Sequence, residues 1–134
     1  MKEKISCVFY TLKHKRAFLK IEKTFLGRNT LRGFMHDVDK IFLYLFCFWM
    51  SIEDIQEFHR KHQKHHVDNN LKKTYADLLE TVIDWESARF TKPDKQLNAY
   101  ETLMKFYPDK REFFLPIIQE YLPDQIIEKK KDDF

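Results

Sequence analysis

The sequence has few of the residues that break regular structure and few that cross-link it. Among 134 residues there are two glycines, four prolines and two cysteines. With so little glycine, tight β-turns are hard to build, which argues against an all-β fold. Cys7 and Cys47 are isolated and far apart, which argues against a disulfide framework and a zinc–thiolate site. Two lone thiols are typical of the reducing cytoplasm, which is the location we expect.

Long hydrophobic runs are also missing. The most apolar stretch, residues 41–50, has about half of the roughly 20 residues that a membrane-spanning helix needs. The N-terminal segment has only a short apolar patch interrupted by Lys13, which does not fit a signal peptide. We therefore expect no membrane association. Residues 41–50 should form either a buried core helix or a surface against a second subunit, as in a homodimer.

Charge of one sign is not abundant either. The net charge is +3 and the sequence pI is about 8.8, with lysine and glutamate mixed along the chain. This gives no strong signal for nucleic-acid binding, because such proteins normally carry a denser basic face. A small positive surplus does permit an anionic small molecule as the substrate.

What the chain does contain favours helices. Its residues are 43% hydrophobic and 34% charged, which excludes a disordered chain and allows one hydrophobic core. We expect an all-α fold, a single-domain bundle of about six helices over residues 1–122, followed by a charged C-terminal tail at 123–134. Apolar residues recur at helical spacing in six segments, at about 6–25, 31–50, 52–67, 71–90, 97–107 and 109–122.

Local signals mark where several of these helices end or begin. Gly27 is placed where a left-handed cap would end the first helix. Asn29 or Thr30 can cap the second, and Ser51 with Asp54 resembles a capping box for the third. Within the tail, residues 126–132 are expected to fray in solvent.

Four of the six histidines fall within residues 59–66. If this segment is helical, His62 and His66 lie one turn apart on the same face, and such a pair can hold one cation. The neighbouring residues Arg60, Lys61 and Lys64 support a plainer interpretation, a basic helix exposed to solvent.

A second candidate group is His36 and Asp37, with Lys40 one turn further on. Histidine is a neutral metal ligand and aspartate can bridge two ions. Lys40 could bring a positive charge to a metal-bound phosphate. The alternatives are a histidine satisfied within the core and a lysine at the surface.

Asp84 lies between Ile83 and Trp85 in the most apolar part of its predicted helix. Burying a carboxylate there costs free energy unless it is paired or binds a metal. Either an ion pair at the helix flank or metal ligation would account for it.

The order His14, His36-Asp37, His62/His65/His66 and Asp84 resembles the HD-domain superfamily of metal-dependent phosphohydrolases. HDVDK at 36–40, HRKHQKHH at 59–66 and IDWESARF at 83–90 are similar to a bacterial and phage branch carrying HDLSK, HxxHNxHH and CDW segments. The resemblance covers about residues 14–90. Asp39, Gln63 and the apolar stretch after Lys40 depart from the branch pattern.

The resemblance implies a helical bundle that binds one or two divalent transition metals such as Mn, Fe, Ni, Co or Zn. The first ion would be held by His14, His36, Asp37 and Asp84. Asp37 would bridge to a second ion held by His62, His65 and His66. The catalytic residues would be Asp37 and Lys40, and a metal-activated water would attack phosphorus. Lys40, His59 and Arg89 are candidates for substrate contacts.

The leading hypothesis is therefore an enzyme that hydrolyses a phosphate monoester or diester in a nucleotide or cyclic nucleotide. A di-iron oxygenase of HD-like fold is a second interpretation of the same ligands. A third is a non-catalytic interaction protein whose helical domain is stabilised by a metal.

Overall fold

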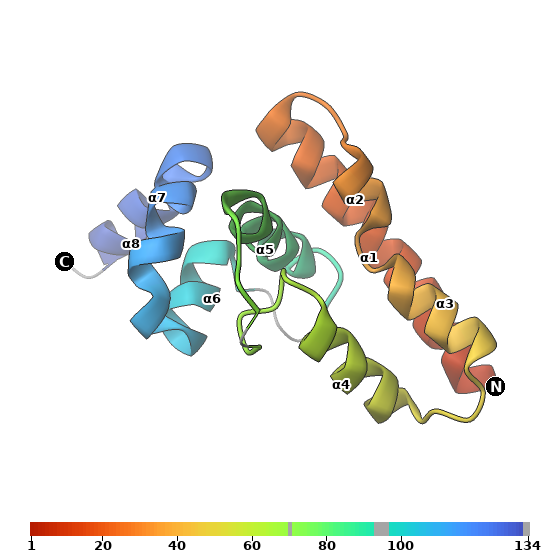
Figure 1. Cartoon of the computed structure of the whole chain (residues 1–134). Coiled ribbons are helices and arrows are strands. Elements are labelled where there is room, and N and C mark those ends of the chain that lie inside the picture. Colours follow the sequence, from red (N-terminus) through yellow and green to blue (C-terminus); the bar gives the residue numbers. More distant parts are fainter. Residues whose placement is uncertain (70, 93–96, 133–134) are drawn as a thin grey trace.

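The structure, a computed structural model, describes residues 1–69, 71–92 and 97–132. All regular elements in these ranges are helices, which confirms the predicted all-α bundle (Figure 1). In chain order they are α1 (Lys2–Leu26), α2 (Leu31–Met35), α3 (Val38–Phe46), α4 (Ile52–His62), α5 (Tyr75–Ala88), α6 (Ala99–Phe106), the 3-10 helix η1 (Pro108–Lys110), α7 (Arg111–Tyr121) and α8 (Pro123–Asp132). In these ranges no helix is long and apolar enough to cross a membrane.

The N-terminal half is organised along α1. Helices α2 and α3 run back along α1, and α4 packs against α3 (Figure 1). A small apolar core joins these helices through Val8 of α1, Tyr44 of α3 and Ile55 of α4. Partly buried side chains pack around these three, and they are Cys7, Ile41, Leu43, Met50 and Ile52.

The larger core lies around α5, which packs against α1 on one side and against α6 and α7 on another. Phe18 of α1 is 1% exposed and inserts into this core. The other members come from α5 to α8, and they are Leu79, Val82, Ile83, Ala99, Leu103, Phe114, Ile117, Ile118 and Ile126. Helix α5 thus supports the side of α1 that carries the buried His14.

The predicted caps are present. Gly27 adopts the left-handed conformation, with φ at 77°, and its N–H donates to the carbonyl of Lys23. The side chain of Thr30 accepts from the N–H of Gly33, and that of Ser51 accepts from the N–H of Asp54. These local bonds fix where α1 ends and where α2 and α4 begin.

The single helix predicted for residues 31–50 is wrong, because the chain breaks between α2 and α3. His36 has a ψ of 126°, and Asp37 is left-handed, with a φ of 59°. Lys15 Nζ donates to the carbonyls of Phe34 and His36, which satisfies groups that a continuous helix would have used. The break turns two consecutive side chains into the bundle.

The first alternative for residues 41–50, a buried core helix, is also wrong. Tyr44 is 3% exposed, but Phe42 and Phe46 on the outer side of α3 are 58% and 59% exposed. The helix ends at Phe46, short of Met50. Of the two alternatives, only an outward apolar surface fits these exposures.

The third predicted helix is too long, because α4 ends at His62 and residues 63–66 form a turn. Asn69 Nδ2 donates to the carbonyls of Arg60 and Gln63, at 2.7 and 2.8 Å. These bonds use carbonyls that another helical turn would have required. His62 and His66 therefore do not share a helix face.

Residues 126–132, which were expected to fray, instead belong to α8. Ile126 is 6% exposed and belongs to the larger core. Gln125 Nε2 donates to both carboxylate oxygens of Glu86, at 3.0 and 3.1 Å. At least the start of α8 is thus packed on the bundle, while residues 133–134 of the expected tail lie outside the described ranges.

Candidate metal centre

One group of metal-ligand side chains comes from three separate parts of the chain. His14 lies on α1, His36 and Asp37 lie at the break before α3, and Asp84 lies on α5. His14 Nε2 and His36 Nε2 are 2.7 and 3.0 Å from the same oxygen of Asp84, Oδ1. His36 Nε2 is also 3.5 Å from Asp37 Oδ2. One ligand atom from each of the four lies within 4.8 Å of the others.

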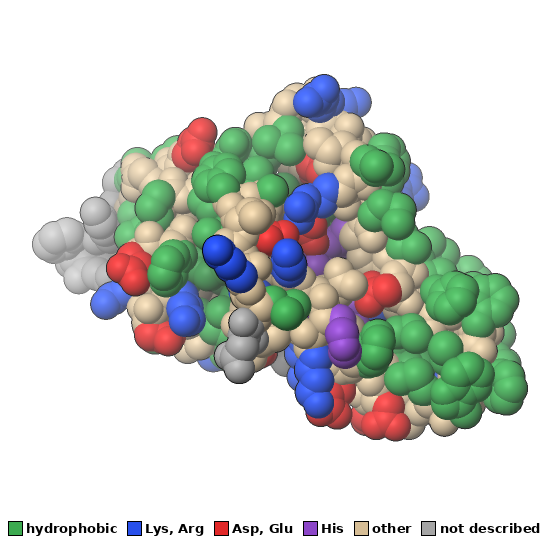
Figure 2. All heavy atoms as spheres, in the orientation of Figure 1, with side chains coloured by type: hydrophobic (Ala, Val, Ile, Leu, Met, Phe, Trp, Pro, Cys, Tyr) green, Lys and Arg blue, Asp and Glu red, His purple; other side chains and the backbone are tan. Residues whose placement is uncertain are grey.

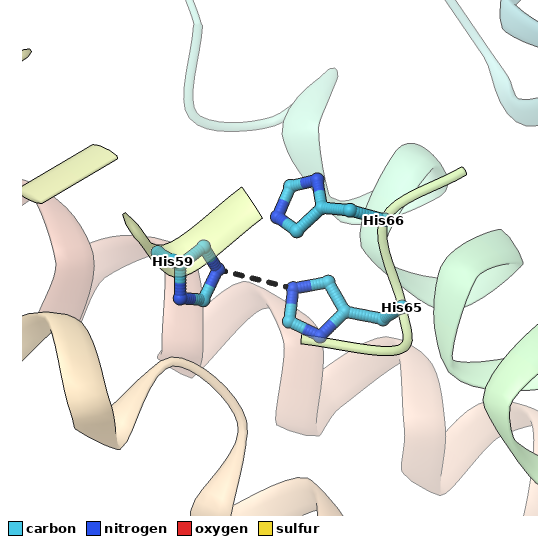
Figure 3. A group of neighbouring side chains, drawn as sticks. All are labelled: His59, His65 and His66. Atoms are coloured by element: carbon cyan, nitrogen blue, oxygen red, sulfur yellow. Dashed lines mark hydrogen bonds between the residues drawn. The ribbon is translucent and has the colours of Figure 1, made fainter. Parts of the chain in front are cut away.

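A second group consists of three histidines at and beyond the end of α4. Figure 3 shows the rings of His59, His65 and His66 turned toward one another. His59 Nε2 and His65 Nε2 are 3.3 Å apart, and all three rings offer atoms within 4.8 Å of one another. His59 and His65 are 1% and 3% exposed.

Asp37 joins the two groups. Its Oδ2 faces His36, while its Oδ1 is 3.0 Å from His59 Nε2 and 3.3 Å from His65 Nε2. Asp37 is the one non-glycine residue in the described ranges with a positive φ. Aspartate tolerates this left-handed region better than most residues. The backbone conformation places a single carboxylate between the two groups.

Two further carboxylates hold the far nitrogens of these rings. Glu80 Oε2 is 3.2 Å from His36 Nδ1 and 2.6 Å from His65 Nδ1. Asp39 Oδ2 is 2.7 Å from His59 Nδ1. A carboxylate on one ring nitrogen fixes the orientation of the ring and directs the other nitrogen to the metal. Glu80 and Asp39 therefore direct three Nε2 atoms into the centre.

The turn carrying His65 and His66 is fixed by bonds to its backbone. Thr81 Oγ1 on α5 donates to the carbonyl of His65 at 2.8 Å. Lys73 Nζ donates to the carbonyl of His66 at 2.5 Å. These bonds hold a non-helical segment against α5 and replace the helix that the sequence predicted there.

The carboxylates change the protonation of the buried rings. Burial alone would lower the pKa of His36, but the charge of Asp37 and hydrogen bonds to Asp84 and Glu80 raise it to about 10. Burial also acts to lower the pKa of His65, but hydrogen bonds to Asp37 and Glu80 raise it to about 9. Burial and the charge of His65 lower the pKa of His66 to about 3.

The donor set fits divalent transition metals. His66 Nε2 is buried and has no hydrogen-bond partner among the described residues. Where Nδ1 of His59 and His65 carries the proton toward Asp39 and Glu80, both Nε2 atoms present lone pairs to Asp37 Oδ1. Facing acceptors need a cation or a proton between them. Two ligands at right angles, each about 2.1 Å from one ion, lie about 3.0 Å apart, comparable to the 2.7–3.5 Å contacts here.

A pocket of about 300 Å³ opens over the two groups. His14, Asp37, His59, His66 and Asp84 form part of its wall. Three cations line it as well, and they are Lys40, Arg60 and Lys92. A larger hollow of about 810 Å³ lies against α7, but its lining includes none of the histidines. The pocket over the histidines therefore places three cationic side chains beside the candidate metal centre.

The structure brings most of the predicted site residues together, but it separates two of them. His14, His36, Asp37, His65, His66 and Asp84 lie in the centre, and Lys40 lines the pocket, with its Nζ 3.9 Å from Asp37 Oδ2. His62 is exposed, its Nδ1 bonds to the carbonyl of Phe58 at 2.8 Å, and its ring stacks on that side chain. Arg89 pairs with Glu86 and does not line the pocket.

Sequence reasoning placed His59 at the substrate, whereas the structure places it among the three histidines. No role was predicted for Asp39 or for Glu80. Helical phase could not have distinguished His59 from His62, because both lie near the helix face that carries the apolar Ile55.

The raised pKa values predict that metal binding releases protons. At pH 7 the rings of His36 and His65 are protonated, since their pKa values are about 10 and about 9. Each must lose a proton to bind a cation through Nε2, so filling the centre should release about two protons. Affinity for Zn²⁺ or Mn²⁺ should rise with pH between about 6 and 9 by up to about tenfold per unit for each proton.

Calorimetric titration in buffers of different ionisation enthalpy measures this release. His66, with a pKa near 3, is neutral throughout and contributes no proton. Metal binding whose affinity is the same at pH 6 and pH 8 would contradict the prediction.

A scan against protein-family models finds no match, and searches of curated proteins and of solved structures find no similar chain. The resemblance to the HD superfamily therefore rests on the sequence motifs alone.

Proposed function

We propose that this protein is a metal-dependent phosphohydrolase of HD type, acting on a nucleotide or a related phosphate monoester or diester. The observation that carries the proposal is the pair of ligand groups sharing Asp37 at the base of a pocket lined by cations. One carboxylate between two His-rich groups suits two ions held close together. In place of His62, the second group takes His59, with His65 and His66.

The ligand types indicate which ions the centre would hold. Mixed imidazole and carboxylate donors suit Mn, Fe, Co, Ni or Zn better than Ca, which prefers oxygen ligands throughout. Such ions lower the pKa of water and neutralise the charge of a phosphoryl group.

The chain's own residues would bind and orient the substrate. Lys40 Nζ, close to Asp37, is placed to hold a phosphoryl oxygen next to the ligands. Arg60 and Lys92 add positive charge at the pocket wall, which suits a phosphate ester. Tyr10, which also lines the pocket, offers an aromatic ring on which a nucleobase can stack. These features favour a nucleotide over an uncharged substrate.

The test is a screen of purified protein against nucleotides, p-nitrophenyl phosphate and bis-p-nitrophenyl phosphate, with Mn, Fe, Co, Ni or Zn added separately. We expect at least one ester to be hydrolysed, activity to be lost after chelation, and activity to return when the ion is restored. Elemental analysis of the protein before chelation identifies the resident ion. Hydrolysis that survives chelation at full rate would contradict the proposal.

Two alternatives use the same centre. A di-iron oxygenase also fits two ligand groups that share a carboxylate. Running the screen without oxygen separates the two, since hydrolysis needs none. A non-catalytic interaction protein is favoured by the exposed apolar side of α3. It predicts that metal raises the melting temperature without any turnover.

The two cysteines indicate the redox state of the compartment in which the protein works. Cys7 and Cys47 are both free thiols. Free thiols suit a reducing compartment, and on that ground we propose the cytoplasm.

A further inference from the structure

We propose that a second copy of this chain binds an exposed apolar surface over α2, α3 and the loop before α4. Figure 2 shows hydrophobic side chains gathered over these elements. We call this the α3 surface, and its members are Leu31, Phe34, Met35, Phe42, Leu45, Phe46, Phe48 and Trp49. The inference does not depend on the proposed hydrolase activity.

The area of the α3 surface fits a stable dimer. Its eight side chains are between 45% and 78% exposed. Large aromatic side chains cover about 150–250 Å² each, so together the eight expose on the order of 1,000 Å². The largest apolar patch of a typical monomer is about 300–600 Å², and a standard interface buries about 800 Å² per partner. The α3 surface is therefore larger than the apolar patch of a typical monomer and large enough for one side of a standard interface.

Its composition suits a protein partner better than a lipid surface. Five of the eight side chains are aromatic, and aromatic residues and methionine are enriched in interfaces. Residues 41–50 contain no charged side chain. Helices that lie on membranes normally carry lysine and arginine beside their apolar face, whereas α3 offers only Asp39 and Lys40.

The arrangement on α3 also suits self-association. Phe42, Leu45 and Phe46 follow the i, i+3, i+4 spacing of a helix-packing stripe. Two identical stripes can pack against each other around a two-fold axis, which makes a closed dimer. The small core beneath α3, with Val8, Tyr44 and Ile55 as its buried members, would then be covered from outside.

Dimerisation would leave the candidate metal centre accessible. None of the eight side chains lines the pocket over the histidines. Lys40, which does line the pocket, is separated from the three stripe residues by about 120° to 160° around the helix axis, at 100° per residue. Helix α3 starts directly after Asp37, so the partner would brace the helix that follows the bridging carboxylate.

The experiment measures the mass of the full-length protein in solution by sedimentation and by light scattering. We expect a particle of twice the 16.5 kDa chain mass at micromolar concentration. The double variant Phe42→Asp/Phe46→Asp should halve that mass. The matched control is Phe113→Asp on α7, a phenylalanine that is 49% exposed away from the α3 surface, and it should remain dimeric.

A second variant keeps the test valid if the double variant does not fold. In a Cys7→Ser/Cys47→Ser background, Phe46→Cys should form an intermolecular disulfide on mild oxidation, whereas Phe113→Cys should not. A monomeric wild-type protein overturns the inference. So does a dimer that persists in a folded Phe42→Asp/Phe46→Asp variant, and so does wild-type protein that is monomeric but binds anionic phospholipid vesicles.

Discussion

Asp37→Asn should strongly reduce ester hydrolysis and remove metal from both ligand groups. Both oxygens of Asp37 face imidazole nitrogens, at 3.5 Å on one side and at 3.0 and 3.3 Å on the other. Asparagine keeps the shape but lacks the charge, and its amide nitrogen cannot be a ligand. We expect kcat/KM to fall on the order of 10³-fold, because the water and the phosphoryl group both depend on the ions.

The variant is expected to fold, since asparagine also tolerates the left-handed backbone that residue 37 adopts. Circular dichroism checks the fold, and elemental analysis together with steady-state kinetics measures the two losses. Asp54→Asn is the matched control, because Asp54 is exposed in the first turn of α4. If Asp37→Asn kept its full metal content and more than about a tenth of the activity, the bridging role would be excluded.

The second large effect is expected from two histidines less than one helical turn apart on α4. His59→Gln should weaken binding of the second ion by at least about 10–100-fold, the loss typical of changes around a metal. His59 is 1% exposed and contacts Asp37 and Asp39. His62→Gln should leave binding unchanged, because His62 is exposed and bonds to the backbone of Phe58.

Competition titration with a chromophoric chelator gives both the affinity and the number of ions per chain. We expect His59→Gln to reduce the tightly bound ions from two to one. The reverse pattern, with His62→Gln losing an ion and His59→Gln unaffected, would restore the ligand set expected from the sequence motif.

The fold features that could be predicted from the sequence are those fixed by local chemistry. Gly27 ends α1, and Ser51 starts α4, because each makes a bond within three or four residues of itself. The convergence of His14, the His36-Asp37 pair and Asp84 could be predicted for another reason. The chain order resembles a known motif, and the structure brings those ligand atoms within 4.8 Å.

The features that were missed depend on side chains that lie outside each segment concerned. The end of α4 is set by Asn69, whose side chain reaches back to the carbonyls of Arg60 and Gln63. The break at Asp37 depends on Lys15, which lies 21 residues before the carbonyl of His36. Packing of α8 depends on Glu86, which is 39 residues from Gln125. No periodicity or propensity within a short window carries this information.

All residues of the two ligand groups lie between His14 and Asp84, and α6, α7 and α8 supply none of them. Those three helices contribute instead to the larger core. Exposed positions on them are therefore the natural places to install affinity tags, fluorophores or surface anchors. Such additions would leave the residues of the two ligand groups unchanged, whereas the buried side chains of these helices should tolerate little substitution, because they form most of the larger core.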